Sequence, residues 1–192
     1  MRGLGCNALA YSIHATIQRW VYKFTPLIEA GFKKRRKTVG HSWRMDETYI
    51  KVKGEWMYLY RAVDKEGKTV DFLLTRRRNK LAAHKFLLKA ISINGCPKVI
   101  NIDKSGANKE AIRTYNKRCF KKIRIRQCKY LNNRVEQDHR FIKWRIQNML
   151  GFKSFESASR TLTGIEIVRM IKKEQVAFPM TTCFKTFCSL AA

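Results

Sequence analysis

The chain has 192 residues, of which 41 are Lys or Arg and 14 are Asp or Glu, so its formal net charge is +27. A hydrophobic fraction of 45% is ordinary for a globular protein and argues against wholesale disorder. The charge predicts a polyanionic partner, most simply DNA or RNA, with an anionic membrane surface or a ribosomal-type structural role as alternatives. No apolar run approaches the roughly 20 residues of a membrane-spanning helix, and no secretory signal opens the chain, so we expect a cytoplasmic protein.

The amino-terminal 40 residues are predicted to form a helix followed by a basic linker. Apolar residues recur at spacings of three and four across residues 13–24, as in an amphipathic helix. Pro26 is expected to open a new segment, which leads into the basic cluster at 33–37. The apolar stripe comprises Ile13, Ile17, Trp20, Val21 and Phe24.

Three antiparallel strands are predicted next, at residues 43–52, 56–64 and 69–75. The first alternates with a period of two, so Asp46 and its neighbour Glu47 should point to opposite faces of the sheet, and Glu47 should not share a site with Asp46. Turn signals at Gly54 and at the KEGK segment separate the strands, which are rich in aromatic and β-branched residues.

Helices and short strands alternate after residue 80. A helix at 81–91 is expected to turn Leu81, Leu88 and Ile91 inward, and the apolar run at 98–103 is typical of a buried strand. The remaining predicted elements are a helix at about 108–118, a strand at 122–127 and helices at 133–149 and about 155–173. The order βββαβαβαα favours an α/β protein, with a mixed sheet and helices on both faces as in the ribonuclease H-like fold.

Three carboxylates, Asp46, Asp103 and Glu136, stand out on so basic a chain. An ionised carboxylate among apolar neighbours costs free energy unless it is paired or binds a metal. Brought together, the three could hold two Mg²⁺ ions, with Mn²⁺ able to substitute, and two such ions can clamp an in-line phosphoryl displacement. Two structural interpretations without a metal stay open. Asp103 could only cap the DKSGAN turn, and Glu136 could only form an ion pair with Arg140 on a solvated helix face.

Several other polar and aromatic residues can be assigned from the pattern alone. Asp138 lies about 200° from Glu136 around the helix and should not join its site, whereas Arg140 and Lys143 return to the Glu136 face. His139 is expected to be packed rather than to bind a metal. The aromatic residues expected in the core are Trp43, Trp56, Trp144 and Tyr130. The candidate phosphate contacts, each of which could also be simply solvated, are Lys143, Arg140, Lys104, Arg76, Arg77 and Arg78.

The six cysteines form no recognisable metal site. They include no CxxC pair, and the closest two, Cys183 and Cys188, have four residues between them and no histidine nearby. We therefore expect no zinc site. Without a secretion signal we also expect reduced thiols.

Three segments together resemble bacterial insertion-sequence transposases of the DDE type, in the branch called insertion-sequence family six. The segments are WRMDETYIKVKGEWMYLYRAVD, DKSGAN and KYLNNRVEQDHRFIKWRIQNMLGFKSFESA, and the resemblance covers roughly residues 12–175. It implies a ribonuclease H-like catalytic domain with Asp46, Asp103 and Glu136 as the triad, a divalent metal, and Lys143 contacting the DNA end. It further implies cutting and joining of DNA at terminal inverted repeats, insertion into target DNA, and at least a homodimer, because two ends must be brought together.

The amino terminus departs from the family pattern. Family members usually carry a full helix-turn-helix before the catalytic domain, and HATIQRWVYKF resembles only its second half. The expected domains are a partial helix-turn-helix remnant with a basic linker at 1–40, the catalytic domain at 41–175 and a tail at 176–192. This resembles an amino-terminally truncated copy. The alternatives for its function are a catalytically inactive DNA-binding remnant and a metal-dependent nuclease, which would use water where a transposase uses a 3′-hydroxyl.

Overall fold

The computed structural model describes residues 4–120, 122–149 and 151–191. The chain forms two compact units. The sheet unit comprises residues 38–153, and the helical unit comprises the residues up to Lys37 together with those from Ser154 onward. Residues 154–175, which the sequence places in the domain at 41–175, therefore group with the amino-terminal helix.

The sheet unit is built on a five-stranded mixed sheet with the strand order β3-β2-β1-β4-β5. The strands are β1 (Ser42–Val52), β2 (Glu55–Asp64), β3 (Thr69–Thr75), β4 (Val99–Ile102) and β5 (Arg124–Gln127). The first three form an antiparallel meander, while β4 pairs in parallel with both β1 and β5. Strand β1 is therefore central, and it buries residues of both faces, such as Met45 and Ile50.

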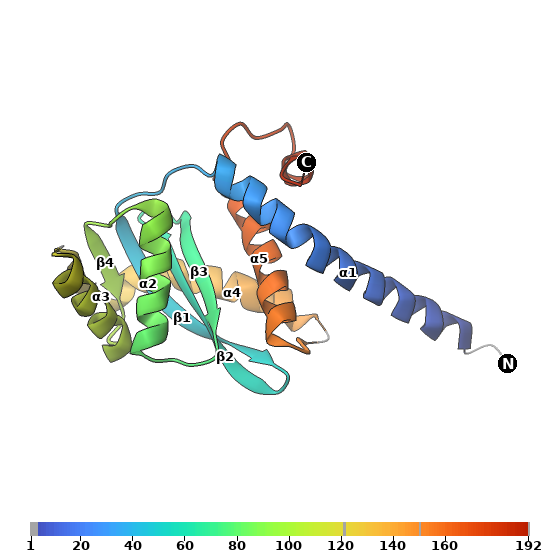
Figure 1. The fold of residues 1–192 in the computed structure, drawn as a ribbon, viewed down its shortest axis with the longest axis horizontal. Helices are drawn as coiled ribbons and strands as arrows, with labels where there is room; N and C mark the ends of the chain where they lie inside the picture. Colours follow the sequence, from blue (N-terminus) through green and yellow to red (C-terminus); the bar gives the residue numbers. More distant parts are fainter. Residues whose placement is uncertain (1–3, 121, 150, 192) are drawn as a thin grey trace. The chain divides into compact units, whose positions relative to one another are not determined.

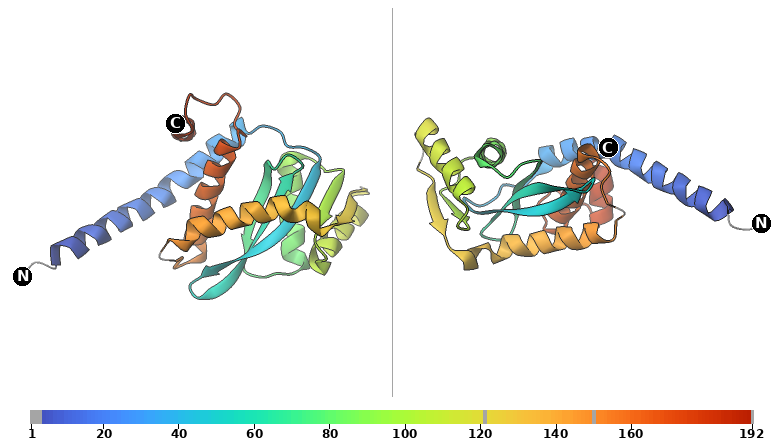
Figure 2. Two further views of the ribbon diagram at one scale, coloured as in Figure 1. Left: turned by 180° about the vertical axis from the view of Figure 1, so that it is seen from behind. Right: turned by 90° about the horizontal axis from the view of Figure 1, so that it is seen from below.

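Helices cover both faces of this sheet (Figure 1 and Figure 2, right). Helices α2 (Lys80–Asn94) and α3 (Gly106–Cys119) lie on one face, and α4 (Asn133–Gln147) lies on the other, preceded by the short 3-10 helix η1 (Lys129–Asn132). The main core fills the layer between the sheet and α2 and α3, with Trp43, Tyr60 and Phe86 among its largest side chains. The predicted element order and the mixed sheet with helices on both faces are confirmed.

Helix α2 buries a different face from the one predicted. Leu81 is 76% exposed and Leu88 is 43% exposed, so their expected inward orientation is wrong, although Ile91 does pack against the core. The buried residues are Ala83, Phe86, Leu87 and Ala90. Apolar residues surround much of this helix, so their spacing alone does not select a face. The two alanines let the backbone approach the sheet closely.

The aromatic residues also divide differently from expectation. Trp43 is buried as predicted, but Trp56, Trp144 and Tyr130 are 60%, 55% and 82% exposed, so their expected place in the core is wrong. An aromatic side chain is amphipathic enough to lie in an interface as readily as in a core. Sequence alone does not separate the two environments.

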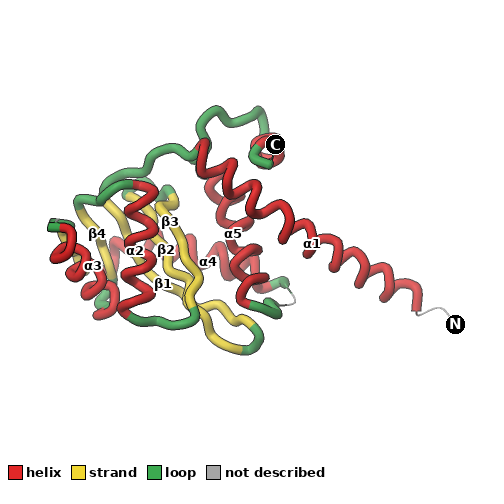
Figure 3. Tube along the Cα trace, in the orientation of Figure 1, coloured by secondary structure: helices red, strands yellow, loops and turns green. Residues whose placement is uncertain are grey.

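The helical unit consists of α1 (Leu4–Arg35), α5 (Phe155–Lys172) and α6 (Cys183–Ser189). Figure 3 shows α1 as one continuous helix, so the predicted break at Pro26 is wrong. A proline inside a helix costs about 3 kcal/mol. Here Thr25, Ile28 and Phe32 are buried around it, and this packing offsets the cost. Of the predicted apolar stripe, Ile17, Trp20 and Phe24 are exposed, and the side chain of Ile13 lies outside the described residues.

The carboxyl-terminal segment contains α6 and is hydrogen-bonded to α1. The sequence suggests no pattern for this segment. The Arg35 guanidinium donates to Ser189 Oγ at 2.9 Å and to the Phe178 carbonyl at 2.8 Å. A Cβ placed on Gly31 would lie 2.1 Å from the Leu190 carbonyl oxygen, so the backbone at Leu190 approaches α1 too closely for a larger residue at this position. Among the described residues, no helix combines the length and apolar character needed to cross a bilayer.

Replacing Gly31 by alanine is expected to destabilise the protein by about 1–3 kcal/mol, because the new methyl group overlaps the Leu190 backbone. This expected change in the free energy of unfolding is opposite in sign to the effect of helix propensity, which favours alanine over glycine by about 1 kcal/mol. Gly164 in α5 is the matched control, since its nearest neighbour is Thr25 Oγ1 at 4.0 Å and alanine there should be neutral or stabilising. Denaturant unfolding of both variants measures the difference. Equal effects of the two substitutions would contradict the close approach.

Candidate active site

Asp46, Asp103 and Glu136 come from three separate elements and line one pocket of about 340 Å³ in the sheet unit. Asp46 lies within β1, Asp103 directly follows β4, and Glu136 lies in the first turn of α4. Strands β1 and β4 are parallel, with Arg44 opposite Asn101. Continuing this register by two residues brings Asp103 level with Asp46 on the same face of the sheet. Helix α4 covers that face and brings Glu136 to the two aspartates (Figure 2, left).

The carboxylate of Asp103 has a second contact, within its own turn. Its Oδ1 accepts a hydrogen bond from the Ser105 backbone N–H at 2.9 Å, and Gln127 donates to its backbone carbonyl at 3.4 Å. The side chain therefore caps the DKSGAN turn and borders the pocket at the same time. The turn fixes the orientation of the carboxylate, so these two readings of Asp103 are compatible.

The pKa of Asp46 is raised from its ordinary value to about 7. Burial is the largest cause because it disfavours the charged form, and the negative charges of Glu47, Asp103 and Glu136 add to it. A cation bound among Asp46, Asp103 and Glu136 would favour the charged form of Asp46 and so offset part of this shift.

His139 is buried beside Asp46, with its Nδ1 3.7 Å from Asp46 Oδ2. Burial, together with the positive charge of Arg61, lowers the pKa of His139 to about 3. The imidazole is therefore neutral at pH 7, and this contact is not an ion pair despite its short distance. The packed role predicted for His139 agrees with its burial.

Replacing Asp46 by asparagine is expected to stabilise the metal-free protein at alkaline pH. The folded-state pKa of about 7 lies above the ordinary value of 3.8, so the unfolded chain releases this proton first and stability falls as pH rises between the two values. Above pH 7 the full penalty of the buried charge remains, and removing it should add about 1–3 kcal/mol. At pH 4 the variant and the parent should differ little. Urea unfolding in EDTA from pH 4 to 8.5 measures this, and an advantage independent of pH would contradict it.

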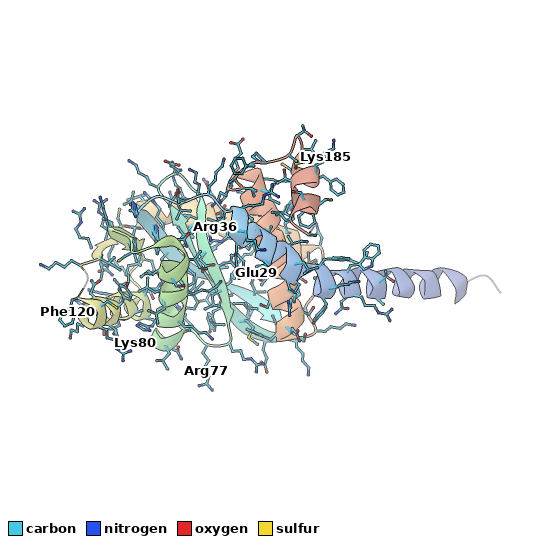
Figure 4. All side chains as sticks on the ribbon, turned by 45° about the horizontal axis from the view of Figure 1, so that its top comes forward. Glu29, Arg36, Arg77, Lys80, Phe120 and Lys185 are labelled. Carbon is cyan, nitrogen blue, oxygen red and sulfur yellow. The ribbon has the colours of Figure 1, made fainter. Side chains whose placement is uncertain are left out.

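The Glu47 side chain is 3% exposed and lies on the other face of the sheet from Asp46, as the strand period predicts. Its carboxylate accepts from Arg78 Nε at 2.5 Å and from Asn108 Nδ2 at 2.9 Å. Arg78 therefore forms an ion pair with Glu47 within the sheet unit. Its neighbours Arg76 and Arg77 are exposed, and Arg77 points outward in Figure 4.

Of the other basic residues predicted to contact DNA, Lys104 and Lys143 line two different pockets. Lys104 lines the carboxylate pocket, as expected from its position next to Asp103. Lys143 lies two helical turns beyond Glu136 and lines a second pocket, with Tyr49 and Trp56. Arg140, between them in sequence, is exposed. The structure therefore brings only Lys104 of this set into the pocket with the triad.

Two asparagines that the sequence did not single out, Asn101 and Asn132, are hydrogen-bonded to each other beside the pocket. Asn132 precedes α4 but makes no capping hydrogen bond; its side chain lines the pocket and accepts a hydrogen bond from Asn101 Nδ2 at 2.5 Å. Asn101 also donates to the Cys128 carbonyl at 3.0 Å. The sequence could have indicated that Asn101 lies near the site, because Asn101 precedes Asp103 by two residues and so shares its face of the sheet.

A buried ion pair lies on the same side. Arg61 is opposite Asp46 on the neighbouring strand β2, and its Nη1 lies 3.1 Å from Asp138 Oδ2. The Arg61 side chain is fully buried and that of Asp138 is 4% exposed. Asp138 does not line the carboxylate pocket, as its position on the helix predicts. It is nevertheless buried two residues from Glu136 and joins α4 to the sheet.

The donor set of the pocket fits a hard divalent cation, since Asp46, Asp103 and Glu136 offer carboxylate oxygens and Asn132 and Gln127 are amides. In the described part of the chain, no three His, Cys, Asp or Glu side chains are arranged to hold one ion between them. The three carboxylates instead border a shared pocket. The described cysteines, Cys96, Cys119, Cys128, Cys183 and Cys188, are free thiols.

Known proteins similar to this chain belong to one family. Residues 40–175 match the model of a family that is described as a DDE domain. The chain is 39% identical over 176 residues to the transposase for insertion sequence element IS257 in transposon Tn4003 of Staphylococcus aureus, covering 91% of this chain and 75% of that protein. It is 40% identical over 163 residues to the transposase for insertion sequence-like element IS431mec of S. aureus strain Mu50, covering 84% and 71%.

The fold is also similar to a solved retroviral structure. The HTLV-2 integrase catalytic core domain in complex with magnesium, in its trimeric form, superposes with a TM-score of 0.52 at 18% identity. The match covers 82% of this chain and all of that one. This likeness supports the ribonuclease H-like fold that the element order predicts.

Proposed function

We propose that this chain, which belongs to the DDE transposases of bacterial insertion sequences, uses Asp46, Asp103 and Glu136 to hold two Mg²⁺ ions, with Mn²⁺ able to substitute. DDE domains are divalent-metal polynucleotidyl transferases. The observation that carries the assignment of residues is the convergence of three carboxylates, from β1, the end of β4 and α4, on one pocket. Two bound ions would activate the attacking hydroxyl and stabilise the leaving oxygen of an in-line displacement.

The protein's own residues orient these ligands. The Ser105 backbone N–H holds the Asp103 carboxylate, Asn101 holds Asn132 at the start of α4, and His139 packs against Asp46 as a neutral imidazole. Lys104 borders the same pocket and would contact a phosphate of the bound DNA. These contacts would position the DNA strand and the carboxylates without a proton transfer by histidine.

Basic residues outside the pocket would hold the DNA backbone. Arg140 and Lys143 continue along α4 from Glu136, and Arg76 and Arg77 are exposed after β3. Arg78, also predicted to bind DNA, pairs with Glu47, so we assign it a supporting role in that turn. Such contacts make binding steeply dependent on salt concentration.

The DNA substrates we propose are the terminal inverted repeats of an insertion sequence and a target duplex. Joining two ends requires at least two active sites, so we propose a homo-oligomer of at least two chains. A protein that acts on bacterial DNA would work in the cytoplasm. We propose residues 41–175 as the catalytic domain, and the family match over residues 40–175 supports this assignment.

A strand-transfer assay tests this function. The purified full chain is mixed with a labelled duplex carrying the element end and a supercoiled plasmid, with Mg²⁺, Mn²⁺ or EDTA. We expect labelled DNA joined to the plasmid with either metal and none in EDTA. Nicked but unjoined DNA would favour a nuclease. Salt-sensitive DNA binding without any cleavage or joining would favour a catalytically inactive DNA-binding protein.

A further inference from the structure

The sheet unit has a second pocket, of about 690 Å³, which shares no described lining residue with the carboxylate pocket. We call it the hairpin pocket. Its walls come from the β1–β2 hairpin, from the last turns of α4 and from Phe152. An adjoining hollow of about 490 Å³ shares Lys51, Gly151 and Phe152 with it and adds Lys53 and Lys153. The two hollows together make a continuous surface beside the hairpin.

Aromatic rings from the hairpin line this pocket although they are open to solvent. Trp56 is 60% exposed and Tyr49 is 44% exposed. Tyr49 contacts Trp56 edge-on at a centroid distance of 6.3 Å and Tyr58 at 5.4 Å, so the three rings form one cluster. An exposed aromatic cluster in a concave site is characteristic of a binding surface.

The charged residues that line the two hollows are all positive. Lys51 and Lys143 line the pocket, Lys51 Nζ lies 5.8 Å from the centre of the Trp56 ring, and Lys53 and Lys153 line the adjoining hollow. Neither hollow has an acidic residue among its described lining. Aromatic faces beside cations fit a ligand that offers flat rings and negative charge together, as unpaired nucleotides do. A paired duplex hides its base faces within the stack.

The position of the hairpin pocket along α4 relates it to the catalytic site. Lys143 follows Glu136 by seven residues, which is about 10 Å along a helix. A strand of duplex DNA advances about 3.4 Å per nucleotide, so the span from Glu136 to Lys143 equals at most roughly three nucleotides. Tyr49 and Trp56 belong to the face of the sheet opposite Asp46, so a strand engaged at the carboxylates would pass Lys143 and the edge of β1, beyond its pairing with β4, to reach these rings.

We propose that the hairpin pocket holds unpaired nucleotides of the DNA strand engaged at the carboxylates, stacking bases on Trp56 and Tyr49 while Lys51 and Lys143 contact the phosphates. This inference rests on the proposed function and extends it to the form of the substrate. The DNA engaged by this protein would be locally unpaired a few nucleotides from the reacting phosphate.

DNA-binding measurements in EDTA test the pocket separately from the chemistry. Fluorescence anisotropy would compare a blunt duplex with the same duplex bearing a three-nucleotide single-stranded tail. We expect the tailed duplex to bind the parent protein at least about 5-fold more tightly, since stacking on an aromatic side chain contributes about 5- to 150-fold per base. A fluorescent adenine analogue in the tail should lose emission on binding. Trp56→Ala should remove the preference for the tail and the quenching, and leave blunt-duplex affinity within about twofold.

Trp144→Ala is the matched control, because Trp144 is similarly exposed, lies on α4 and is absent from the described lining of the pocket. It should keep the full preference for the tail. Equal binding of both duplexes by the parent protein, or equal losses in the two tryptophan variants, would overturn the proposal. A change in self-association caused by Trp56→Ala, seen in sedimentation without a change in tail preference, would instead assign the surface to a second copy of the chain.

The outcomes also separate this inference from the proposed function. Strand transfer without any preference for the tail would overturn the hairpin pocket and leave the catalytic assignment standing. Preference for the tail that depends on Trp56, in a protein that never joins DNA, would support nucleotide binding at the pocket and contradict the transposition chemistry.

Discussion

Asp103→Asn is expected to lower the rate of strand transfer by at least about 100- to 1,000-fold while changing the free energy of unfolding by less than about 1 kcal/mol. Outer contacts around metal ligands are worth about 10- to 100-fold, and losing the charge of a ligand itself should cost more. The asparagine side-chain oxygen can still accept from the Ser105 N–H, so the turn that Asp103 caps should persist. The substitution thus separates the cation-binding role of Asp103 from its turn-capping role.

Single-turnover strand transfer with Mg²⁺ and with Mn²⁺, beside urea unfolding, measures both quantities. Asp103→Ala removes both roles and should lose activity and about 1 kcal/mol of stability. Glu110→Gln, an exposed carboxylate on α3, is the control and should change neither. If Asp103→Asn kept its activity and only Asp103→Ala lost it, the residue would be a structural cap, and the triad would need a different third member.

Much of the fold could be predicted because the sheet has strong local signals. The period of two in β1 fixes which residues share the face of Asp46, and the glycine turns fix the meander. The convergence of Asp46 and Asp103 follows once β1 and β4 are known to be parallel neighbours. That neighbourhood depends on pairing between residues more than 50 positions apart, which no local pattern shows, and it was inferred from the order of the elements and from the resemblance to a known family.

Helical periodicity was a weaker guide, because it describes one helix without its neighbours. It correctly separated Asp138 from the Glu136 face, yet it could not show that Arg61 on β2 would lie opposite Asp138. It failed on α2, where apolar residues occupy several faces, and Leu81 and Leu88 proved exposed. It also ended a helix at Pro26, where tertiary packing carries α1 through the proline.

The largest expected effect on stability concerns the buried pair of Arg61 and Asp138. Asp138→Leu should destabilise the protein by about 3–5 kcal/mol, because it removes the carboxylate beside a guanidinium that water cannot reach. The double variant Arg61→Met with Asp138→Leu should recover most of that loss, since a well-packed apolar pair of similar volume is often neutral or stabilising. The exposed pair of Arg113 and Glu110, both on α3, is the control, and its removal should cost at most about 1 kcal/mol.

The double variant also tests why a buried ion pair is placed behind the pocket. Arg61 is opposite Asp46 on the neighbouring strand, and Asp138 is two residues from Glu136, so the pair fixes the helix carrying one carboxylate to the sheet carrying another. An apolar pair has no comparable directionality, so strand transfer should remain about 10- to 100-fold slower after stability is restored. Weaker dependence of the rate on Mg²⁺ concentration in the parent than in the double variant would support this positioning role. Full recovery of both stability and rate would show that the pair contributes only packing, and that the carboxylates are oriented by Asn101, Ser105 and their own strands.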